Sequence, residues 1–336
     1  MKDARLLVQA LREPASVQDL PERDWTALIA VARAESLIGS LAYRPDGLSL
    51  PSKVERILDA SRRDAEQARR QALWEAEMAR RALAPLGIPV ILLKGTAYVS
   101  AGLSAGTGRS IGDLDILVPR DTLDRVQEAL LGAGWEWVKE DSYDDLYYRQ
   151  WMHELPPLIH RERDRMIDVH HTILPLTHRR KPDANAMVAQ SVELENGLRV
   201  LSPADMVVHS VAHLFADGDL AGGLRNLWDI DRMLRQFARA DGFWDNLATR
   251  SRLHQLRPEV SRALRLANKL YGTPIDRQLA GGASSADGFF ERRLLARNGW
   301  GQAINKPLRF TFYVRSHWLR MPPLMLARHL WTKARK

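Results

Sequence analysis

The chain has 336 residues, of which 45% are hydrophobic and 27% are charged, so it can bury a sizeable core and is neither disordered nor fibrous. It contains no cysteine, which excludes disulfides, a thiolate nucleophile and zinc sites with sulfur ligands. The net charge is +8, but eleven Lys or Arg and no acidic residue follow Glu291, so the excess lies near the C-terminus.

Membrane insertion and secretion are not expected. The longest apolar runs, such as residues 89–93, are far shorter than the ~18–20 residues of a membrane helix. The N-terminus carries mixed charge and has no secretory hydrophobic region. We therefore expect a cytoplasmic protein with no transmembrane segment.

Residues 1–85 are predicted to be helical. Asp24 is the expected N-cap of a helix that contains Trp25 and Leu28. A long helix is expected from Ser52 to just before Pro85, because alanines, arginines and glutamates dominate this stretch.

The pattern changes at Gly87 to short apolar runs separated by helical periods. Helices are expected at residues 96–103 and 122–131, and strands at residues 88–93, 113–118, 135–138, 154–160 and 166–173. The turn 161–165 (RERDR) predicts a hairpin between the last two strands. These elements predict a small α/β core at residues 86–175.

From Ser202 the pattern becomes helical again, with Ser202 as N-cap and Pro203 as the first helical residue. Helices are also expected at 224–237 and 243–271. We therefore predict a helical domain at 176–280 and a basic, aromatic C-terminal segment at 281–336. This segment either packs its apolar side on the body of the protein, with Lys and Arg in water, or binds an anionic partner such as nucleic acid, a membrane surface or an acidic protein.

Residues 92–119 (LLKGTAYVSAGLSAGTGRSIGDLDILVP) combine three features that suit a nucleotide site. Gly95 and Thr96 follow a strand in a turn that opens a helix, where free N–H groups and a hydroxyl suit phosphate. Lys94 and Arg109 supply positive charge for phosphate. Asp113 and Asp115, two residues apart on a strand, point to the same side and repel each other, and a hard cation such as Mg²⁺ or Mn²⁺ would remove that repulsion.

The order of these residues resembles the first motif of the DNA polymerase β-like nucleotidyltransferases, in which a Gly-Ser/Thr turn precedes a strand with Asp-x-Asp. Lys94-Gly95 followed by GDLDILV resembles more closely an uncharacterised bacterial nucleotidyltransferase family, which is similar to the nucleotidyltransferase toxins of abortive-infection systems. Residues 167–171 (IDVHH), 201–215 and 224–234 resemble later parts of that family. The resemblance implies an α+β fold, with a small mixed sheet flanked by N- and C-terminal helical regions.

The same resemblance implies transfer of an NMP from an NTP donor to a hydroxyl acceptor, with release of pyrophosphate. Asp113, Asp115 and Asp168 would be catalytic and hold two Mg²⁺ (or Mn²⁺) ions. Asp168 is alternatively a partner that positions His170 or His171. Gly95 and Thr96 would hold the β- and γ-phosphates, and the charges of Lys94 and Arg109 would stabilise the reacting phosphates. The acceptor stays open among a protein, an RNA, and a small molecule or polysaccharide precursor.

Further residues near this motif have two interpretations each. His170 is a possible supporting residue, and Arg225 and Asp229 either line the nucleotide or acceptor side of the cleft or form a surface i, i+4 ion pair. His209 and His213 have the spacing of two zinc ligands on a helix, but Ser210 stands where the zinc-protease pattern needs Glu, which favours helix packing.

Two other function classes are open. A glycosyltransferase would use Asp-x-Asp and Mn²⁺ to bind a nucleotide-sugar, although that fold usually needs a longer α/β domain before the pair. A non-catalytic protein would bind a nucleotide or a partner without turnover.

Overall fold

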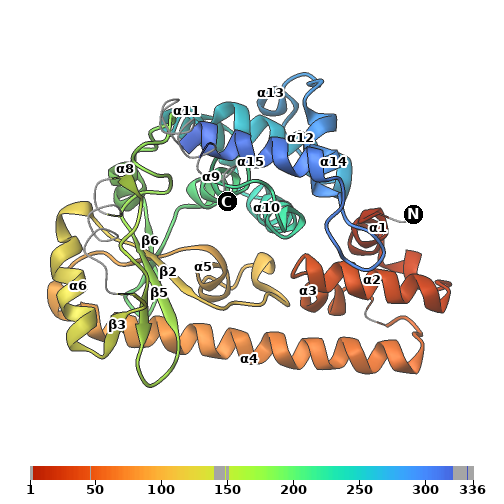
Figure 1. Ribbon diagram of the computed structural model, residues 1–336. Helices are drawn as coiled ribbons and strands as arrows, with labels where there is room; N and C mark the ends of the chain where they lie inside the picture. Colours follow the sequence, from red (N-terminus) through yellow and green to blue (C-terminus); the bar gives the residue numbers. More distant parts are fainter. Residues whose placement is uncertain (1–2, 46, 140–147, 149–150, 321–330, 332–336) are drawn as a thin grey trace.

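The computed structural model describes residues 3–45, 47–139, 148, 151–320 and 331. It contains a mixed sheet with helices before and after it (Figure 1), which confirms the expected α+β class. Among the described residues, we find no helix with both the length and the apolar character needed to cross a membrane.

Four helices precede the sheet: α1 (Arg5–Arg12), α2 (Glu22–Ala34), α3 (Ile38–Ala42) and α4 (Ser52–Leu83). The prediction of Asp24 as the N-cap of α2 was wrong, because the helix begins at Glu22 and Asp24 lies in its first turn. Pro21 supplies the extended residue, with φ −66° and ψ 155°, that precedes this helix.

The long helix α4 confirms the prediction for residues 52 onward and connects the N-terminal helices with the sheet. It contacts α3, α5 and α6 (Leu123–Gly132), and in Figure 1 it runs below α3 and α5. Its solvent side is held by ion pairs such as those of Glu66 with Arg69 and Arg70. Small residues form much of its buried side: Ala65, Ala72, Ala76 and Ala79. α4 can therefore lie close to α5 (Lys94–Ser100) and to the sheet.

In the described part of the chain, seven short strands form one sheet in the order β3-β4-β5-β2-β1-β7-β6. The strands are β1 (Ile91–Leu92), β2 (Leu114–Leu117), β3 (Trp135–Trp137), β4 (Leu158–His160), β5 (Met166–His170), β6 (Val192–Glu193) and β7 (Arg199–Val200). β4 and β5 form the predicted antiparallel hairpin. β2 is the central strand: it pairs in parallel with β5 and antiparallel with β1.

The hairpin of β6 and β7 was not predicted, because residues 176–280 were expected to be helical. Each of these strands is two residues long, which is too short for an alternating pattern to show in the sequence. β7 pairs in parallel with β1 and so extends the sheet beyond the predicted core.

The chain after β5 is mainly helical: α8 (Ala184–Ala189), α9 (Pro203–Ala212), α10 (Gly223–Phe237), α11 (Phe243–Leu253), α12 (Arg257–Tyr271), α13 (Arg277–Ala280), α14 (Asp287–Leu294) and α15 (Lys306–Arg320). The predicted cap of α9 is confirmed, since the Ser202 hydroxyl accepts a hydrogen bond from the Asp205 N–H at 3.3 Å. Figure 1 shows α5 between α4 and the pair α9 and α10, so α5 links the sheet to the C-terminal helices.

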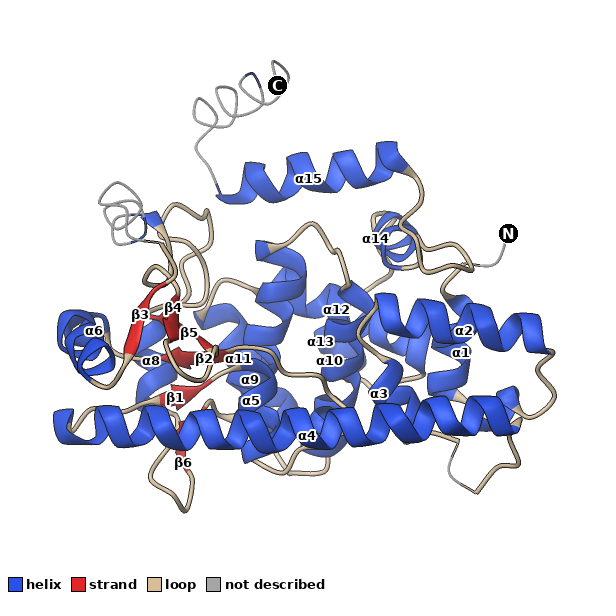
Figure 2. Ribbon diagram, turned by 60° about the horizontal axis from the view of Figure 1, so that its bottom comes forward, coloured by secondary structure: helices blue, strands red, loops and turns tan. Residues whose placement is uncertain are grey.

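Helix α15 lies along one edge of the molecule (Figure 2) and packs one side on the body. Phe312 is fully buried, with its ring centroid 4.9 Å from that of Phe289 and 5.1 Å from that of Phe290. On the other side, Phe310 is 63% exposed. For α15 this supports the packing interpretation. Residues 321–330 and 332–336 of the predicted basic segment lie outside the described residues, and an anionic partner stays a prediction.

Candidate active site

Three carboxylates that the sequence singled out lie together beside strands β2 and β5. Asp115 is opposite Asp168 in the parallel register, and Asp113 lies two residues before Asp115. One ligand oxygen from each of the three side chains lies within 4.8 Å of the others. Leu114 and Ile116, which alternate with the aspartates, are buried in the core. The alternation of a single strand therefore separates the polar site from the core, as predicted.

Asp115 is the most buried of the three and has two hydrogen-bond donors at one oxygen. Lys94 Nζ lies 2.5 Å and His170 Nε2 lies 2.9 Å from Asp115 Oδ1. Burial alone would raise the pKa of Asp115, but the charge of Lys94 and the hydrogen bond from His170 hold it well below its usual value. Burial alone would lower the pKa of Lys94, but its interactions with Asp115 and the charges of Asp113 and Asp168 together raise it. Asp115 is therefore an anion at neutral pH.

The three aspartates have the chemistry of a hard-cation site. Burial raises the pKa of Asp168, and the neighbouring charge of Asp115 raises it further. A divalent cation would relieve this repulsion, and a set of carboxylate oxygens is what Mg²⁺ or Mn²⁺ prefers. Asp113 is exposed and Asp168 is half-buried, so the group is open to solvent on one side. The residues fit the cation that the sequence implies.

The turn that opens α5 brings Lys94 to these carboxylates. Lys94 has a φ of +47°, in the left-handed region that residues other than glycine rarely adopt. Such strain is typical of functional sites, where the surrounding structure holds it in place. Gly95 and Thr96 follow in the first turn of α5, and both are buried. The structure thus places the predicted phosphate turn next to the predicted cation site.

The side chain of Arg109, which was expected to bind phosphate, contacts protein groups instead. Its guanidinium pairs with Asp229 and lies 5.5 Å from the ring centroid of Tyr98. A Cβ added to Gly95 would lie 2.6 Å from Arg109 Nε. The missing side chain of Gly95 therefore makes room for Arg109.

Arg225 and Asp229 form the i, i+4 ion pair that was one of two interpretations, but its expected position at the surface was wrong. Arg225 is 6% exposed and Asp229 is 1% exposed, because α10 packs against the loop that carries Arg109. Arg225 also donates to the Ser40 hydroxyl at 2.7 Å, which donates to the Thr107 carbonyl at 3.0 Å. Asp229 therefore pairs with two buried guanidinium groups, those of Arg109 and Arg225.

Comparison with protein families bears on this arrangement. The family model described as "Uncharacterised nucleotidyltransferase" matches residues 21–272, which include the whole sheet, the three aspartates and α10. The chain belongs to this nucleotidyltransferase family. A comparison with curated proteins found no match.

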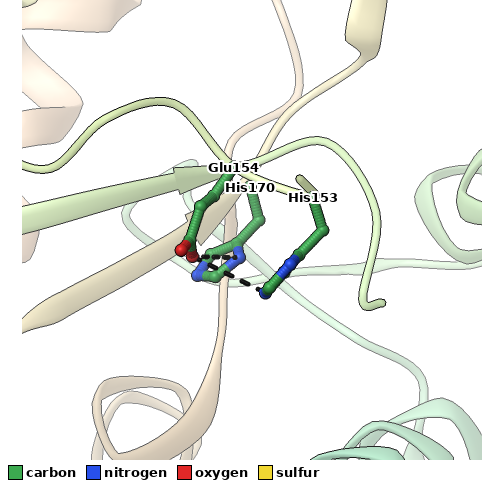
Figure 3. Close-up of side chains that lie close together, drawn as sticks. All are labelled: His153, Glu154 and His170. Carbon is green, nitrogen blue, oxygen red and sulfur yellow. Dashed lines mark ion pairs between the residues drawn. The ribbon is translucent and has the colours of Figure 1, made fainter. Parts of the chain in front are cut away.

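A second group of possible metal ligands was not predicted as a site. Figure 3 shows the side chains of His153, Glu154 and His170 converging, and one ligand atom from each lies within 4.8 Å of the others. His170 Nδ1 lies 3.3 Å from Glu154 Oε2. The only signal in the sequence is that His153 and Glu154 are adjacent, at the start of the strand expected at residues 154–160. A long-range bridge between Glu154 and His170, which sequence patterns do not reveal, completes the group.

Within the described residues, His209 and His213 belong to no group of three or more possible metal ligands. His209 is buried on α9, and burial together with the charge of Lys94 lowers its pKa to about 3. His209 is therefore neutral at physiological pH. Its imidazole is a polar but uncharged neighbour of Lys94.

Proposed function

We propose that the chain is a metal-dependent nucleotidyltransferase of the polymerase β-like type, which transfers an NMP from an NTP to a hydroxyl acceptor and releases pyrophosphate. The observation that carries the proposal is the meeting of Asp113, Asp115 and Asp168 beside two parallel strands, with Lys94 in contact. Membership of a nucleotidyltransferase family supports it. We also propose that the chain is similar to the nucleotidyltransferase toxins of abortive-infection systems.

In this proposal, Asp113, Asp115 and Asp168 hold Mg²⁺ or Mn²⁺. The bound cation would neutralise phosphate charge and lower the pKa of a coordinated hydroxyl. The carboxylates contribute by position, because the β2–β5 register fixes Asp115 opposite Asp168. The buried side chains on the other faces of both strands keep that register rigid.

Lys94, Gly95 and Thr96 are the residues we assign to the triphosphate. Without a cation, Lys94 balances the charge of Asp115, and its flexible stem allows it to turn to the β- and γ-phosphates when a cation takes over that task. Arg109 packs against Gly95 and so supports the turn, and Asp229, which also pairs with Arg225, holds Arg109 in place. His170 holds Asp115 from the other side.

The transfer step needs few groups from the protein. The acceptor oxygen attacks the α-phosphorus and forms the new P–O bond, while the bond between the α-phosphorus and the bridging oxygen breaks and pyrophosphate leaves. Asp168, half-buried beside Asp115, is placed to take the proton of the acceptor hydroxyl. Lys94 balances negative charge on the leaving pyrophosphate.

Thermal stability of the purified protein tests the proposal. Each of the four NTPs, and UDP-glucose as the rival ligand, is added with and without Mg²⁺ or Mn²⁺. A ligand at 100 times its Kd stabilises by about 2.7 kcal/mol, which raises the Tm measurably. We expect a metal-dependent rise with an NTP that the Asp113→Asn/Asp115→Asn variant loses and the exposed Asp164→Asn control keeps.

Each result has a definite meaning. A rise only with UDP-glucose would favour the glycosyltransferase, and no rise with any nucleotide would overturn the proposed site. If an NTP binds, the same NTP labelled at the α-phosphate identifies the acceptor by transfer of label. Binding without any transfer to protein, RNA or small-molecule acceptors would favour the non-catalytic alternative.

A further inference from the structure

His153, Glu154 and His170 come from two segments that meet at the end of the sheet. Glu154 forms an isolated antiparallel bridge with His170, the last residue of β5. Glu154 Oε2 lies 3.3 Å from His170 Nδ1 and 3.6 Å from His153 Nε2. The two imidazole rings stack, with an angle of 28° between their planes and centroids 5.2 Å apart. One nitrogen of each ring lies near the carboxylate of Glu154 (Figure 3).

His153 has no hydrogen bond that explains its burial. Its side chain is only 12% exposed, yet within the described residues its Nδ1 has no partner, and its Nε2 is too far from Glu154 for a normal hydrogen bond. Buried polar groups in folded proteins nearly always have a partner. Burial, followed by the charge of His170, lowers the pKa of His153 well below its ordinary value, so this imidazole is a neutral potential ligand.

His170 is already oriented as a metal ligand would be. Because an ionised carboxylate only accepts hydrogen bonds, His170 Nε2 must donate its proton to Asp115 at 2.9 Å. In the neutral tautomer, Nδ1 then has its lone pair free on the side of Glu154. Metal-ligating histidines usually donate their other ring N–H to a carboxylate in this way.

The spacing of the donors also fits a metal ion. Zinc bonds to nitrogen and oxygen are about 2.0–2.2 Å, so two donors of a tetrahedral ion lie roughly 3.3–3.6 Å apart. The two measured donor separations, 3.3 Å and 3.6 Å, match that edge. Two imidazoles and one carboxylate form a donor set that suits zinc and other first-row transition ions better than Mg²⁺.

We propose that His153 Nε2, Glu154 Oε2 and His170 Nδ1 bind one divalent transition-metal ion, with Zn²⁺ as the type case. This site is separate from the three aspartates and does not rest on the proposed nucleotidyl transfer. The ion would fasten residues 153–154 to the end of β5 and fix the ring that supports Asp115.

The test measures Zn²⁺ binding by calorimetry on the full-length chain without a histidine tag, after treatment with EDTA. Mg²⁺ is present in millimolar excess to occupy the aspartates. Binding of Co²⁺, followed by its visible absorption, reports nitrogen ligation independently. The variants are His153→Gln and Glu154→Gln, and the exposed Glu162→Gln on the β4–β5 turn is the matched control. Asp113→Asn/Asp168→Asn removes two of the three ligands at the other site.

We expect one Zn²⁺ per chain in the unmodified protein, in Glu162→Gln and in Asp113→Asn/Asp168→Asn. We expect at least tenfold weaker binding and loss of the Co²⁺ spectrum in His153→Gln and Glu154→Gln. Equal melting temperatures in EDTA show that these two variants still fold. If one of these two variants does not fold, the Zn²⁺ affinity of the other variant tests the proposal. Unchanged Zn²⁺ affinity in both, or loss only in the aspartate variant, would overturn the proposal. Neither result depends on NTP binding.

Discussion

Asp115 and Asp168 lie directly opposite each other on the parallel strands β2 and β5. Asp115 is balanced by Lys94 and His170, whereas burial and the charge of Asp115 raise the pKa of Asp168. An acid whose pKa is raised on folding weakens the fold as it ionises, so the charge of Asp168 costs stability at neutral pH. Such a loss of stability is expected at a cation site, because its carboxylates repel each other when no cation is bound.

Asp168→Asn should therefore stabilise the metal-free protein and disable the site. In EDTA at pH 7, we expect the free energy of unfolding to rise by about 1 kcal/mol, because one of two facing charges is removed. The metal-dependent rise in Tm with NTP should disappear. Urea unfolding and thermal shift measure the two effects, with Asp164→Asn as control. A metal-free variant that is less stable than the unmodified protein would contradict the repulsion.

Gly95→Ala tests whether Gly95 makes room for Arg109. The new Cβ would lie 2.6 Å from Arg109 Nε and 3.0 Å from Ile111 Cγ1, so the buried guanidinium has to move. Overpacking of this kind should lower the free energy of unfolding by about 1–3 kcal/mol, and urea unfolding measures this loss. Gly288→Ala in α14 is the matched control, because its Cβ would meet nothing within 4 Å and alanine favours a helix. Equal stability of the two variants would show that Arg109 is not held against Gly95.

The sequence predicted the local parts of the site well. The strand of β2 and the shared face of Asp113 and Asp115 follow from alternation within a few residues. The hairpin of β4 and β5 was predicted from another local signal, the turn at residues 161–165. The parallel pairing of β2 with β5 was not predicted, since pairing of distant strands leaves no periodic signal, and Asp168 was grouped with Asp113 and Asp115 only through the family resemblance.

What the sequence did not predict depends on contacts between distant segments. Arg109 was expected to supply positive charge for phosphate, but its guanidinium pairs with Asp229, 120 residues later in the chain. His153 and Glu154 were not singled out, because only the fold brings them to His170. Local patterns thus predicted the strand that carries Asp115, and tertiary packing decided which side chains surround it.

Removal of the Asp229 charge should destabilise the protein strongly. Its two oxygens pair with Arg109 and Arg225, and all three side chains are largely buried. Asp229→Asn would leave two like charges close together without a counter-ion, which costs about 3–5 kcal/mol. Chemical unfolding measures the loss, and Asp241→Asn, at an exposed position before α11, should change stability by less than about 0.5 kcal/mol. Similar effects of the two substitutions would mean that the buried cluster tolerates net positive charge.

Asp205 should control the stability of the C-terminal helices toward acid. Its carboxylate is fully buried and accepts from Arg250 at 2.7 and 2.6 Å and from His254 at 3.1 Å. Burial alone would raise the pKa of Asp205, but the hydrogen bonds from His254 and Arg250 lower it below the ordinary value. A carboxylate with a lowered pKa stabilises the fold above its unfolded pKa, about 3.9, and this stabilisation is lost as the pH falls through the folded pKa.

Asp205→Asn should therefore cost about 3–5 kcal/mol at pH 7, and its deficit relative to the unmodified protein should shrink as the pH falls below about 4. Unfolding by urea at a series of pH values from 7 to 3 measures this convergence. The exposed Asp19→Asn serves as control and should run parallel to the unmodified protein over the whole series. A deficit that stays constant with pH would show that Asp205 acts through packing and hydrogen-bond geometry, because only the loss of its charge can make the two curves meet.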